Sequence, residues 1–259
     1  EEAIVREGSD TVAALFLEPV QNAGGCFVPP PGYFDRVREI CDRHDVLLVS
    51  DEVICAYGRI GHMFGCERFG YIPDVITSAK GLTSAYAPLS ATIISDEIYD
   101  VISVPQAAGS VFAHGFTYSG HPVCCAAALE NIAILEREDI CGHVQRVGPY
   151  FGERLASLAD LGIVGDVRGS HFMQCVENVA DKETKELFDP SVHVGDRVAD
   201  ACEKRGLIVR PIAHLNVLSP PLVLSVEQID HRKTEQDFRS VFLHTRLDRW
   251  DILAWHHSA

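Results

Sequence analysis

The stretch VLLVSDEVICAYGRIGHMFGCERFGYIPDVITSAKGL, residues 46–82, contains two apolar runs, and each is followed by a charged side chain. VLLVSDEV (46–53) is almost unbroken in its apolar character, which is typical of a strand covered on both faces. DVITSAK (74–80) is rich in β-branched residues, which favours a second strand. We therefore predict two buried strands, with Asp51 at the end of the first and Lys80 just past the second.

Strands and helices alternate on both sides of this stretch. TVAALFLEP (11–19) is an apolar run of strand length, and SATIIS (90–95) predicts a further strand. PPPGYFDRVREICDRHD (29–45) starts with prolines and then spaces its apolar residues for one face of a helix. GHPVCCAAALENIAILERED (120–139) predicts a long helix. This alternation predicts a doubly wound α/β sheet, which we assign to a large domain over residues 1–145.

The pattern changes from about Gly148 onward. GIVGDVRGSHFMQCVE (162–177) predicts a hairpin around Gly169, and VGDRVADACEKRG (194–206) predicts a helix closed by its last glycine. LIVR (207–210) predicts a short strand, and NVLSPPLVLS (216–225) an extended stretch before a polar helix. We assign these elements to a small C-terminal α+β domain over residues 146–259.

Composition and charge exclude several classes of function. The formal net charge of −15 repels phosphate backbones and anionic lipid, so nucleic acid and membrane surfaces are not expected partners. The nine cysteines are scattered without a C-x-x-C pair, which predicts reduced thiols in a cytoplasmic protein. The sequence contains no apolar run of membrane-spanning length, no zinc-site spacing and no phosphate-binding G-x-x-x-x-G-K-[ST] loop.

Three charged residues follow strands of the predicted sheet: Glu18, Asp51 and Lys80. Open α/β sheets bind ligands beyond the carboxyl ends of their strands. A buried lysine amine is a nucleophile that forms Schiff bases, and a carboxylate can keep a pyridine nitrogen protonated. Together they are the minimum set for pyridoxal-phosphate chemistry. The alternative is that Asp51 caps a turn and that Lys80 points to water.

Several motifs of this sequence, taken in their order along the chain, resemble the class III pyridoxal-phosphate-dependent aminotransferases, or ω-aminotransferases, which have fold type I. The central one is LVSDEVICAYGRIGHMFGCERFGYIPDVITSAKGL (48–82). LEPVQNAGGCFVPPPGYF (17–34) and HGFTYSGHPVCCAAAL (114–129) match the segments that flank it in that family, and GLIVRPIAHLNVLSPPL (206–222) matches the C-terminal domain. The resemblance covers the chain to about residue 230.

The resemblance implies a role for each residue that matches a family position. Lys80 would form the Schiff base with pyridoxal 5'-phosphate and move the substrate proton, and Asp51 would pair with the pyridine nitrogen. Val53, two residues along the predicted strand, would pack against the ring, and Glu18 would line the site. Two further positions carry over. Thr117 would reach the cofactor phosphate of the neighbouring subunit in a homodimer, and Arg210 would clamp a substrate carboxylate.

Other polar residues near these motifs are interpreted as structural or loop residues. We interpret Arg59 as structural and Gln21 and Asn22 as turn residues, and His114 and His121 as loop histidines that solvent or hydrogen bonds satisfy.

The chain also departs from the family in its N-terminal part, at three single positions and in its tail. The Gly/Ser-rich phosphate-binding segment of the family lies upstream of any matching stretch here, so we expect the N-terminal part of the cofactor domain to be lacking. Ala56, Ile60 and Ala85 stand where the family often has other residues, and the tail 230–259 is atypical.

Three functions are compatible with these residues. The first is a transaminase that moves an amino group from an amine, diamine or ω-amino acid to a keto acid such as pyruvate. The second is a truncated, catalytically incomplete homologue that acts as a dimerisation partner. The third is a mutase, racemase or decarboxylase, since the same lysine and aspartate would serve each of them.

Overall fold

The computed structural model describes residues 1–104, 109 and 111–230. The chain divides into two compact units, which we call unit 1 (residues 1–19 and 29–142) and unit 2 (residues 20–28 and 143–259). Residues 20–28, which the sequence analysis included in the large domain, belong to unit 2. The tail beyond residue 230 lies outside the described residues.

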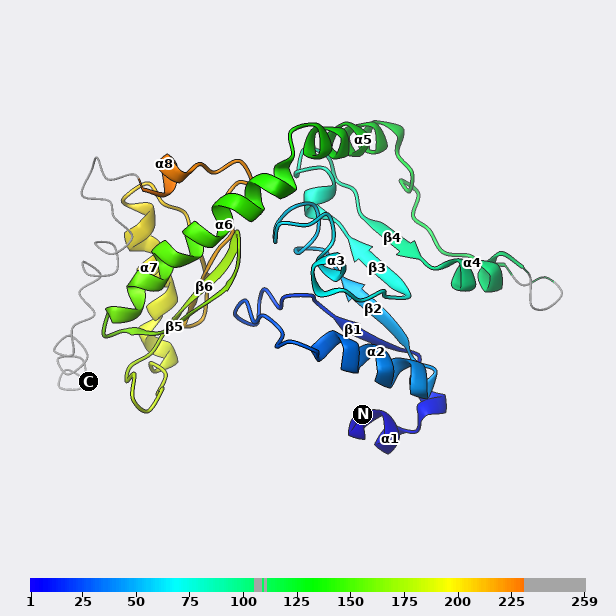
Figure 1. The fold of residues 1–259 in the computed structure, drawn as a ribbon, viewed down its shortest axis with the longest axis horizontal. Coiled ribbons are helices and arrows are strands. Elements are labelled where there is room, and N and C mark those ends of the chain that lie inside the picture. Colours follow the sequence, from blue (N-terminus) through cyan, green and yellow to red (C-terminus); the bar gives the residue numbers. More distant parts are fainter. Residues whose placement is uncertain (105–108, 110, 231–259) are drawn as a thin grey trace. The chain divides into compact units, whose positions relative to one another are not determined.

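Unit 1 is built on a sheet whose strand order is β1-β2-β3-β4 (Figure 1). The strands are β1 (Ala14–Leu17), β2 (Leu47–Asp51), β3 (Val75–Ser78) and β4 (Ala91–Ile94). The pairs β1–β2 and β2–β3 are parallel, whereas β3–β4 is antiparallel. The sheet is therefore mixed, because the connection between β3 and β4 is a turn rather than the crossover helix that parallel neighbours need.

The helices of unit 1 follow the apolar spacing of the sequence. They are α1 (Glu2–Glu7), α2 (Tyr33–His44), α3 (Gly65–Phe69), α4 (Asp96–Ser103) and α5 (Pro122–Arg137), with short 3₁₀ turns at Ser9–Thr11 and Lys80–Leu82. One apolar face of α2 packs with residues of β2 and α3 in a common core. Its buried members are Phe34, Val37, Cys41, Leu48, Cys66 and Tyr71.

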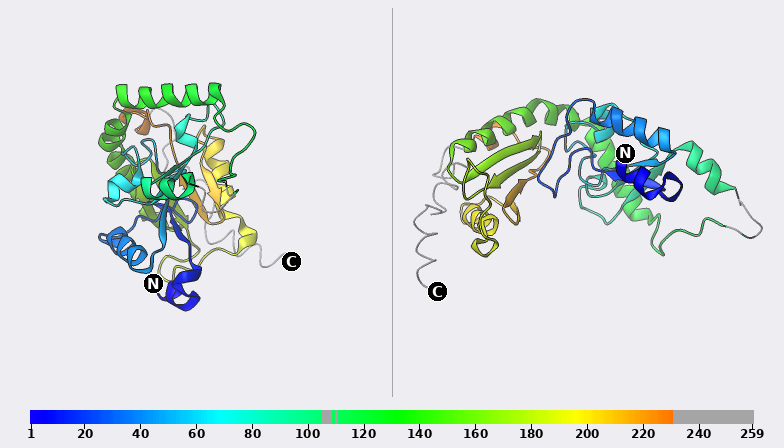
Figure 2. Two further views of the ribbon diagram at one scale, coloured as in Figure 1. Left: turned by 90° about the vertical axis from the view of Figure 1, so that its right-hand side faces the viewer. Right: turned by 90° about the horizontal axis from the view of Figure 1, so that it is seen from below.

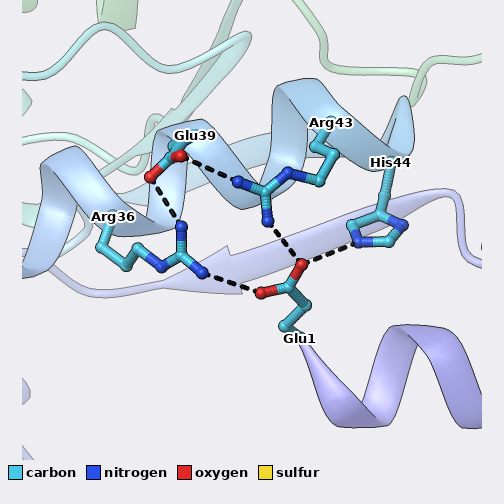
Figure 3. Close-up of polar contacts among 5 residues, drawn as sticks. All are labelled: Glu1, Arg36, Glu39, Arg43 and His44. Carbon is cyan, nitrogen blue, oxygen red and sulfur yellow. Dashed lines mark hydrogen bonds and ion pairs between the residues drawn. The ribbon is translucent and has the colours of Figure 1, made fainter.

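An exposed network of ion pairs joins α1 to α2 (Figure 3). The Glu1 carboxylate lies 2.9 Å from Arg36 Nη2, 2.6 Å from Arg43 Nη1 and 3.3 Å from His44 Nε2. Glu39, which lies between the two arginines on α2, contacts both of them. The hydrogen bonds from Arg43 and His44 lower the pKa of Glu1. Because solvent and salt screen exposed pairs, the network orients α1 rather than stabilising the fold strongly.

Unit 2 contains an antiparallel sheet of order β5-β6-β8-β7. The strands are β5 (Val164–Ser170), β6 (Met173–Asn178), β7 (Arg210–Ile212) and β8 (Leu215–Leu218). The helices are α6 (Ile140–Ala156), which starts in unit 1, α7 (Val194–Glu203) and α8 (Val226–Ile229), with 3₁₀ turns at Ser157–Asp160 and Pro190–Val192. Both α6 and α7 lie against this sheet (Figure 2).

Two expectations for unit 2 are corrected. The strand predicted at 207–210 starts only at Arg210, because the turn that leaves α7 ends at Gly206, with φ +80°, and residues 207–209 lie outside the strand. The helix α6 continues through Gly148, where the sequence analysis placed a change of pattern. Cβ atoms built on Gly148 and Gly152 would lie 2.7 Å from His171 and 3.1 Å from Gln174, so these glycines allow close packing of α6 on the hairpin.

Segment 20–28 is bound within unit 2 by Arg168 of β5. The guanidinium donates a 2.6 Å hydrogen bond from Nε to the Gly25 carbonyl and lies 4.2 Å from the centre of the Phe27 ring. It is also paired with Glu177 of β6. Burial lowers the pKa of Arg168, but its carboxylate partners more than offset this, and the net shift is upward. The segment is therefore held by a charged side chain that stays protonated.

Among the described residues, no helix combines the length and the apolar character that crossing a membrane requires.

Candidate active site

Three side chains predicted for the site follow neighbouring strands of the unit 1 sheet. Glu18 follows β1, Asp51 ends β2, and Lys80 lies two residues past β3. Since β1, β2 and β3 are parallel, their carboxyl ends lie at the same edge of the sheet (Figure 1). Asp51 pairs in register with Thr77, three residues before Lys80. The fold thus places a carboxylate and an amine at the edge where open α/β sheets bind ligands.

Asp51 is fixed by contacts on both sides. Its Oδ1 accepts a 3.1 Å hydrogen bond from the Val53 amide and a 3.3 Å bond from the Thr77 hydroxyl. The side chain is half-buried. The turn-capping role that the sequence left open is therefore present, and it uses one oxygen of the carboxylate.

The expected position of Val53 on the strand is wrong. The strand β2 ends at Asp51, and Val53 lies in the turn that follows. The physical reason is the hydrogen bond from the Val53 amide to the Asp51 side chain, which replaces ladder pairing with a local turn. The side chain of Val53 is half-buried.

Lys80 opens a 3₁₀ turn and has a φ of +39°. Positive φ is uncommon for a residue with a Cβ, and it is frequent at functional sites. The expectation that Lys80 is buried is wrong for this chain, in which its side chain is exposed. The reason is that Lys80 lies beyond the last residue of β3, at the start of a 3₁₀ turn rather than within the sheet.

The acidic residue next to Asp51 is the more deeply buried of the two. Glu52 is 0% exposed, and it accepts 2.8 Å hydrogen bonds from the amides of Gly65 and Cys66 at the start of α3. Ser50 donates a third bond of 3.2 Å. Burial raises the pKa of Glu52, and these hydrogen bonds oppose the rise. This role of Glu52 was not predicted from the sequence, although a charged residue that continues an apolar run was a signal for it.

Two further polar residues brace the same strands. Asp74 accepts a 2.6 Å bond from the Leu48 amide and a 2.8 Å bond from Arg38 Nη1, which ties the start of β3 to β2 and α2. Arg59, interpreted as structural, lies in the loop after Asp51, and burial lowers its pKa to about 10.

The remaining predicted residues lie on exposed or separate segments. Thr117 is exposed in a turn of unit 1, and His114 and His121, which lie outside that turn on either side, are also exposed. Arg210 is the exposed first residue of β7 in unit 2, where it pairs with Val217 of β8.

The turn interpretation of Gln21 and Asn22 agrees with the structure. Gln21 pairs with Phe27 across a short bridge, and the Asn22 carbonyl accepts the Gly25 amide at 3.0 Å.

Residues 1–235 match the class III aminotransferase family, and the chain therefore belongs to this family. The chain is 50% identical over 241 residues to a probable aminotransferase of Mycobacterium tuberculosis, with 90% of this chain and 50% of the relative covered. It is 43% identical over 231 residues to the putrescine–pyruvate aminotransferase of Pseudomonas aeruginosa, with 89% and 50% covered.

Solved structures agree with this assignment. The PLP-bound amine transaminase from an uncultivated Pseudomonas species has a TM-score of 0.87 and 41% identity, with 94% of this chain and 54% of that chain covered. The predicted α/β architecture of fold type I is confirmed by this likeness together with the family match. The chain spans about half the length of the curated relatives that it matches.

Proposed function

We propose that this chain carries the lysine and the aspartate of a pyridoxal-phosphate-dependent aminotransferase site. The observation that supports this most directly is the parallel pairing of β2 with β3, since it brings Asp51 and the segment before Lys80 to one edge of the sheet. The amino donor would be an amine, a diamine or an ω-amino acid, and the acceptor a keto acid such as pyruvate. The relatives that are named as aminotransferases favour amino transfer over mutase, racemase or decarboxylase chemistry.

The residues at this edge suit the cofactor. Lys80 supplies a primary amine for its aldehyde, on a flexible stem that is exposed beyond β3. Asp51 supplies a carboxylate whose orientation is set through Oδ1, as a partner for a protonated ring nitrogen. Val53, in the adjoining turn, supplies an aliphatic side chain that can pack on the ring. When bound, pyridoxal phosphate provides an electron sink that acidifies the carbon carrying the substrate amine.

The roles of the protein side chains follow from their chemistry. The Nζ of Lys80 would accept the proton from the substrate carbon that carries the amine and would return it to the aldehyde-derived carbon of the cofactor, on the other side of the nitrogen. Asp51 would keep the ring nitrogen protonated throughout, because a carboxylate stabilises the adjacent positive charge. Glu18 would line the site at the end of β1.

Substrate binding and assembly are further parts of the proposal. Arg210 would bind a carboxylate of the substrate, because a guanidinium presents paired N–H donors that match two carboxylate oxygens. Thr117 would bind the cofactor phosphate of a second copy of the chain in a homodimer. The exposure of Thr117 in its turn is compatible with such a contact.

We also propose a reducing compartment, the cytoplasm, for this activity. All nine cysteines of the chain are free thiols, and seven of them are buried. Thiols in this state are usual where glutathione and thioredoxin act.

The proposal is tested by titrating the chain with pyridoxal phosphate and following the visible absorption band of lysine-bound cofactor. Borohydride reduction and peptide mapping then locate the modified lysine. We expect a saturable band and label on Lys80, and neither in Lys80→Ala. Lys204→Ala, which removes another exposed lysine, is the matched control and should behave like the unmodified chain.

A second step separates amino transfer from simple binding. Addition of putrescine should bleach the band, and subsequent addition of pyruvate should restore it. A chain that gives no saturable band, or label spread over several lysines, would contradict the proposal and leave the dimerisation-partner hypothesis.

A further inference from the structure

A single amide side chain on α5 holds the turn that begins at Lys80. Asn131 donates from Nδ2 to the carbonyl oxygens of Gly81, at 2.9 Å, and Leu82, at 3.1 Å. Its Oδ1 accepts a 2.7 Å hydrogen bond from the Ser84 hydroxyl. One residue, 47 or more positions away in sequence, therefore makes three hydrogen bonds to the stretch that follows the lysine.

This turn has an unusual concentration of left-handed backbone. Lys80, Ser84 and Ala85 have φ values of +39°, +48° and +64°, and none of them is glycine. Each such residue costs roughly 1–3 kcal/mol unless its surroundings compensate. The turn is closed by the Lys80 carbonyl, which accepts the amides of Thr83 and Ala85, both at 3.3 Å. External contacts are therefore needed to keep this conformation.

The turn is also restrained by packing. A Cβ on Gly81 would lie only 3.0 Å from Tyr57 Cβ, so the chain passes directly over this side chain. The Tyr57 hydroxyl is itself 3.0 Å from the Ser78 hydroxyl at the end of β3. Leu82 and Thr83 are buried. Packing against Tyr57 and the hydrogen bonds of Asn131 therefore restrain the turn together.

We propose that Asn131 is a positioning residue that sets the direction in which Lys80 leaves the edge of the sheet. This inference rests on the proposed function of Lys80, because only then does the direction of its amine matter. Asn131 is suited to the task since an amide offers two N–H donors for two carbonyls and an oxygen for a hydroxyl. An aspartate of the same shape would lose both donors.

The first test is hydrogen–deuterium exchange on the whole chain without cofactor. In Asn131→Ala we expect the amides of residues 82–86, which the turn protects, to exchange about tenfold faster. Glu130→Ala, an adjacent exposed position of α5, is the matched control and should leave them unchanged. An equal increase in β2 and α5 would indicate general destabilisation and would overturn the proposal, as would no increase at all.

The second test measures the lysine itself. Competitive acylation of the cofactor-free chain with acetic anhydride, mapped by mass spectrometry, gives the relative reactivity of each lysine amine. We expect the acylation reactivity of Lys80 to change at least about threefold in Asn131→Ala and in Asn131→Asp, because both variants lose the donors to the two carbonyls. The reactivity of Lys204 should be unaffected. Unchanged reactivity of Lys80 in a variant whose turn exchanges faster would overturn the positioning role.

Both tests are independent of the proposed function. If the unmodified chain forms no lysine-bound cofactor, the aminotransferase proposal fails, and the exchange and acylation results still decide whether Asn131 positions Lys80. If the unmodified chain binds cofactor, Asn131→Ala should capture it about tenfold more slowly than Glu130→Ala. Equal rates of capture would also overturn the inference.

Discussion

Asp51 has a backbone role that leaves its proposed ligand role possible. Its Oδ1 accepts the Val53 amide and the Thr77 hydroxyl, and these bonds orient the carboxylate at the end of β2. A side chain fixed in this way loses little conformational freedom when it binds a charged group. The structural and the functional readings of Asp51 are therefore compatible.

Asp51→Asn separates these two roles. The variant keeps an oxygen acceptor for Val53 and Thr77, so we expect its free energy of unfolding to change by less than about 1 kcal/mol. It loses the negative charge, so its affinity for pyridoxal phosphate should fall at least about tenfold, or about 1.4 kcal/mol. Cofactor titration and urea denaturation measure the two effects.

Asp45→Asn is the control for this prediction. It makes the same chemical change at an exposed residue that ends α2 with a φ of +54°, a conformation that asparagine tolerates. Its cofactor affinity should equal that of the unmodified chain. Equal affinity in Asp51→Asn would show that Asp51 does not pair with the ring nitrogen.

Single positions were predicted unevenly from the sequence. Asp51 and Lys80 were placed correctly relative to the strands, because an apolar run that ends in a charge is a local pattern. The burial of Lys80 and the strand position of Val53 were wrong. Both depend on where a strand ends. After Asp51 the strand ends because of a side-chain hydrogen bond, and before Lys80 it ends because a 3₁₀ turn begins.

At the scale of elements, the junction between β2 and α3 depends on Glu52. This buried carboxylate accepts the first amides of α3, which have no partner within the helix. Burial raises the pKa of Glu52, so the folded chain binds its proton more tightly than the unfolded chain does. Its contribution to stability is therefore complete below about pH 4.5, the ordinary value, and declines as the pH rises through the folded-state pKa.

Glu52→Gln should destabilise the chain by about 1–3 kcal/mol, since an amide nitrogen would face one of the helix amides. This loss of stability should be greatest at acidic pH and should shrink toward pH 8. The reason is that the stabilising contribution of Glu52 declines as the pH rises, whereas the glutamine does not titrate. Urea denaturation between about pH 5 and 8 measures this difference. Glu67→Gln, which alters an exposed hydrogen bond from the Phe64 amide, is the control and should lower the free energy of unfolding by less. If the difference in free energy of unfolding between the unmodified chain and Glu52→Gln grew as the pH rises, the role assigned to Glu52 would be contradicted.

Elements with a strong local period were predicted well, and connections were not. The helix α2 follows from the spacing of its buried residues, and it starts after Gly32, which has a φ of +77°. The direction of β4 and the continuation of α6 through Gly148 could not be read from the sequence. The first is set by a turn and the second by close packing on a hairpin that lies later in the chain.

At the scale of the whole molecule, the two units are connected by more than one crossing of the chain. Residues 20–28 leave unit 1 directly after Glu18 and Pro19 and are bound by Arg168 of unit 2. The arrangement shows why a domain division read along the sequence is incomplete: a short segment can belong to the unit that binds it rather than to the one that surrounds it in sequence.

The thiols test the described packing of both units at once. Seven of the nine cysteines are buried, and only Cys125 and Cys141 are half-buried. Burial also raises the pKa of Cys66 and of Cys202 to about 12 and raises that of Cys141, which slows reaction because the thiolate is the nucleophile.

Native thiol labelling should therefore be restricted to few sites. With a maleimide at neutral pH we expect Cys125 to react first, Cys141 at least about tenfold more slowly, and the other thiols only after denaturation in urea. Mass spectrometry with peptide mapping gives the order. Rapid labelling of Cys41 or Cys66, which lie in the core of unit 1, would contradict the packing described for α2 and α3.

The sequence by itself determined the α/β class, the family and the residues that carry the proposed chemistry, because these depend on local periodicity and on motifs in a fixed order. Only the tertiary structure decided that Glu52 caps α3, that Arg168 binds segment 20–28, and that Asn131 holds the turn at Lys80. Each of these contacts joins residues between 13 and 143 positions apart. A hydrogen bond over such a separation is specified by the packing of whole elements, which local sequence patterns do not encode.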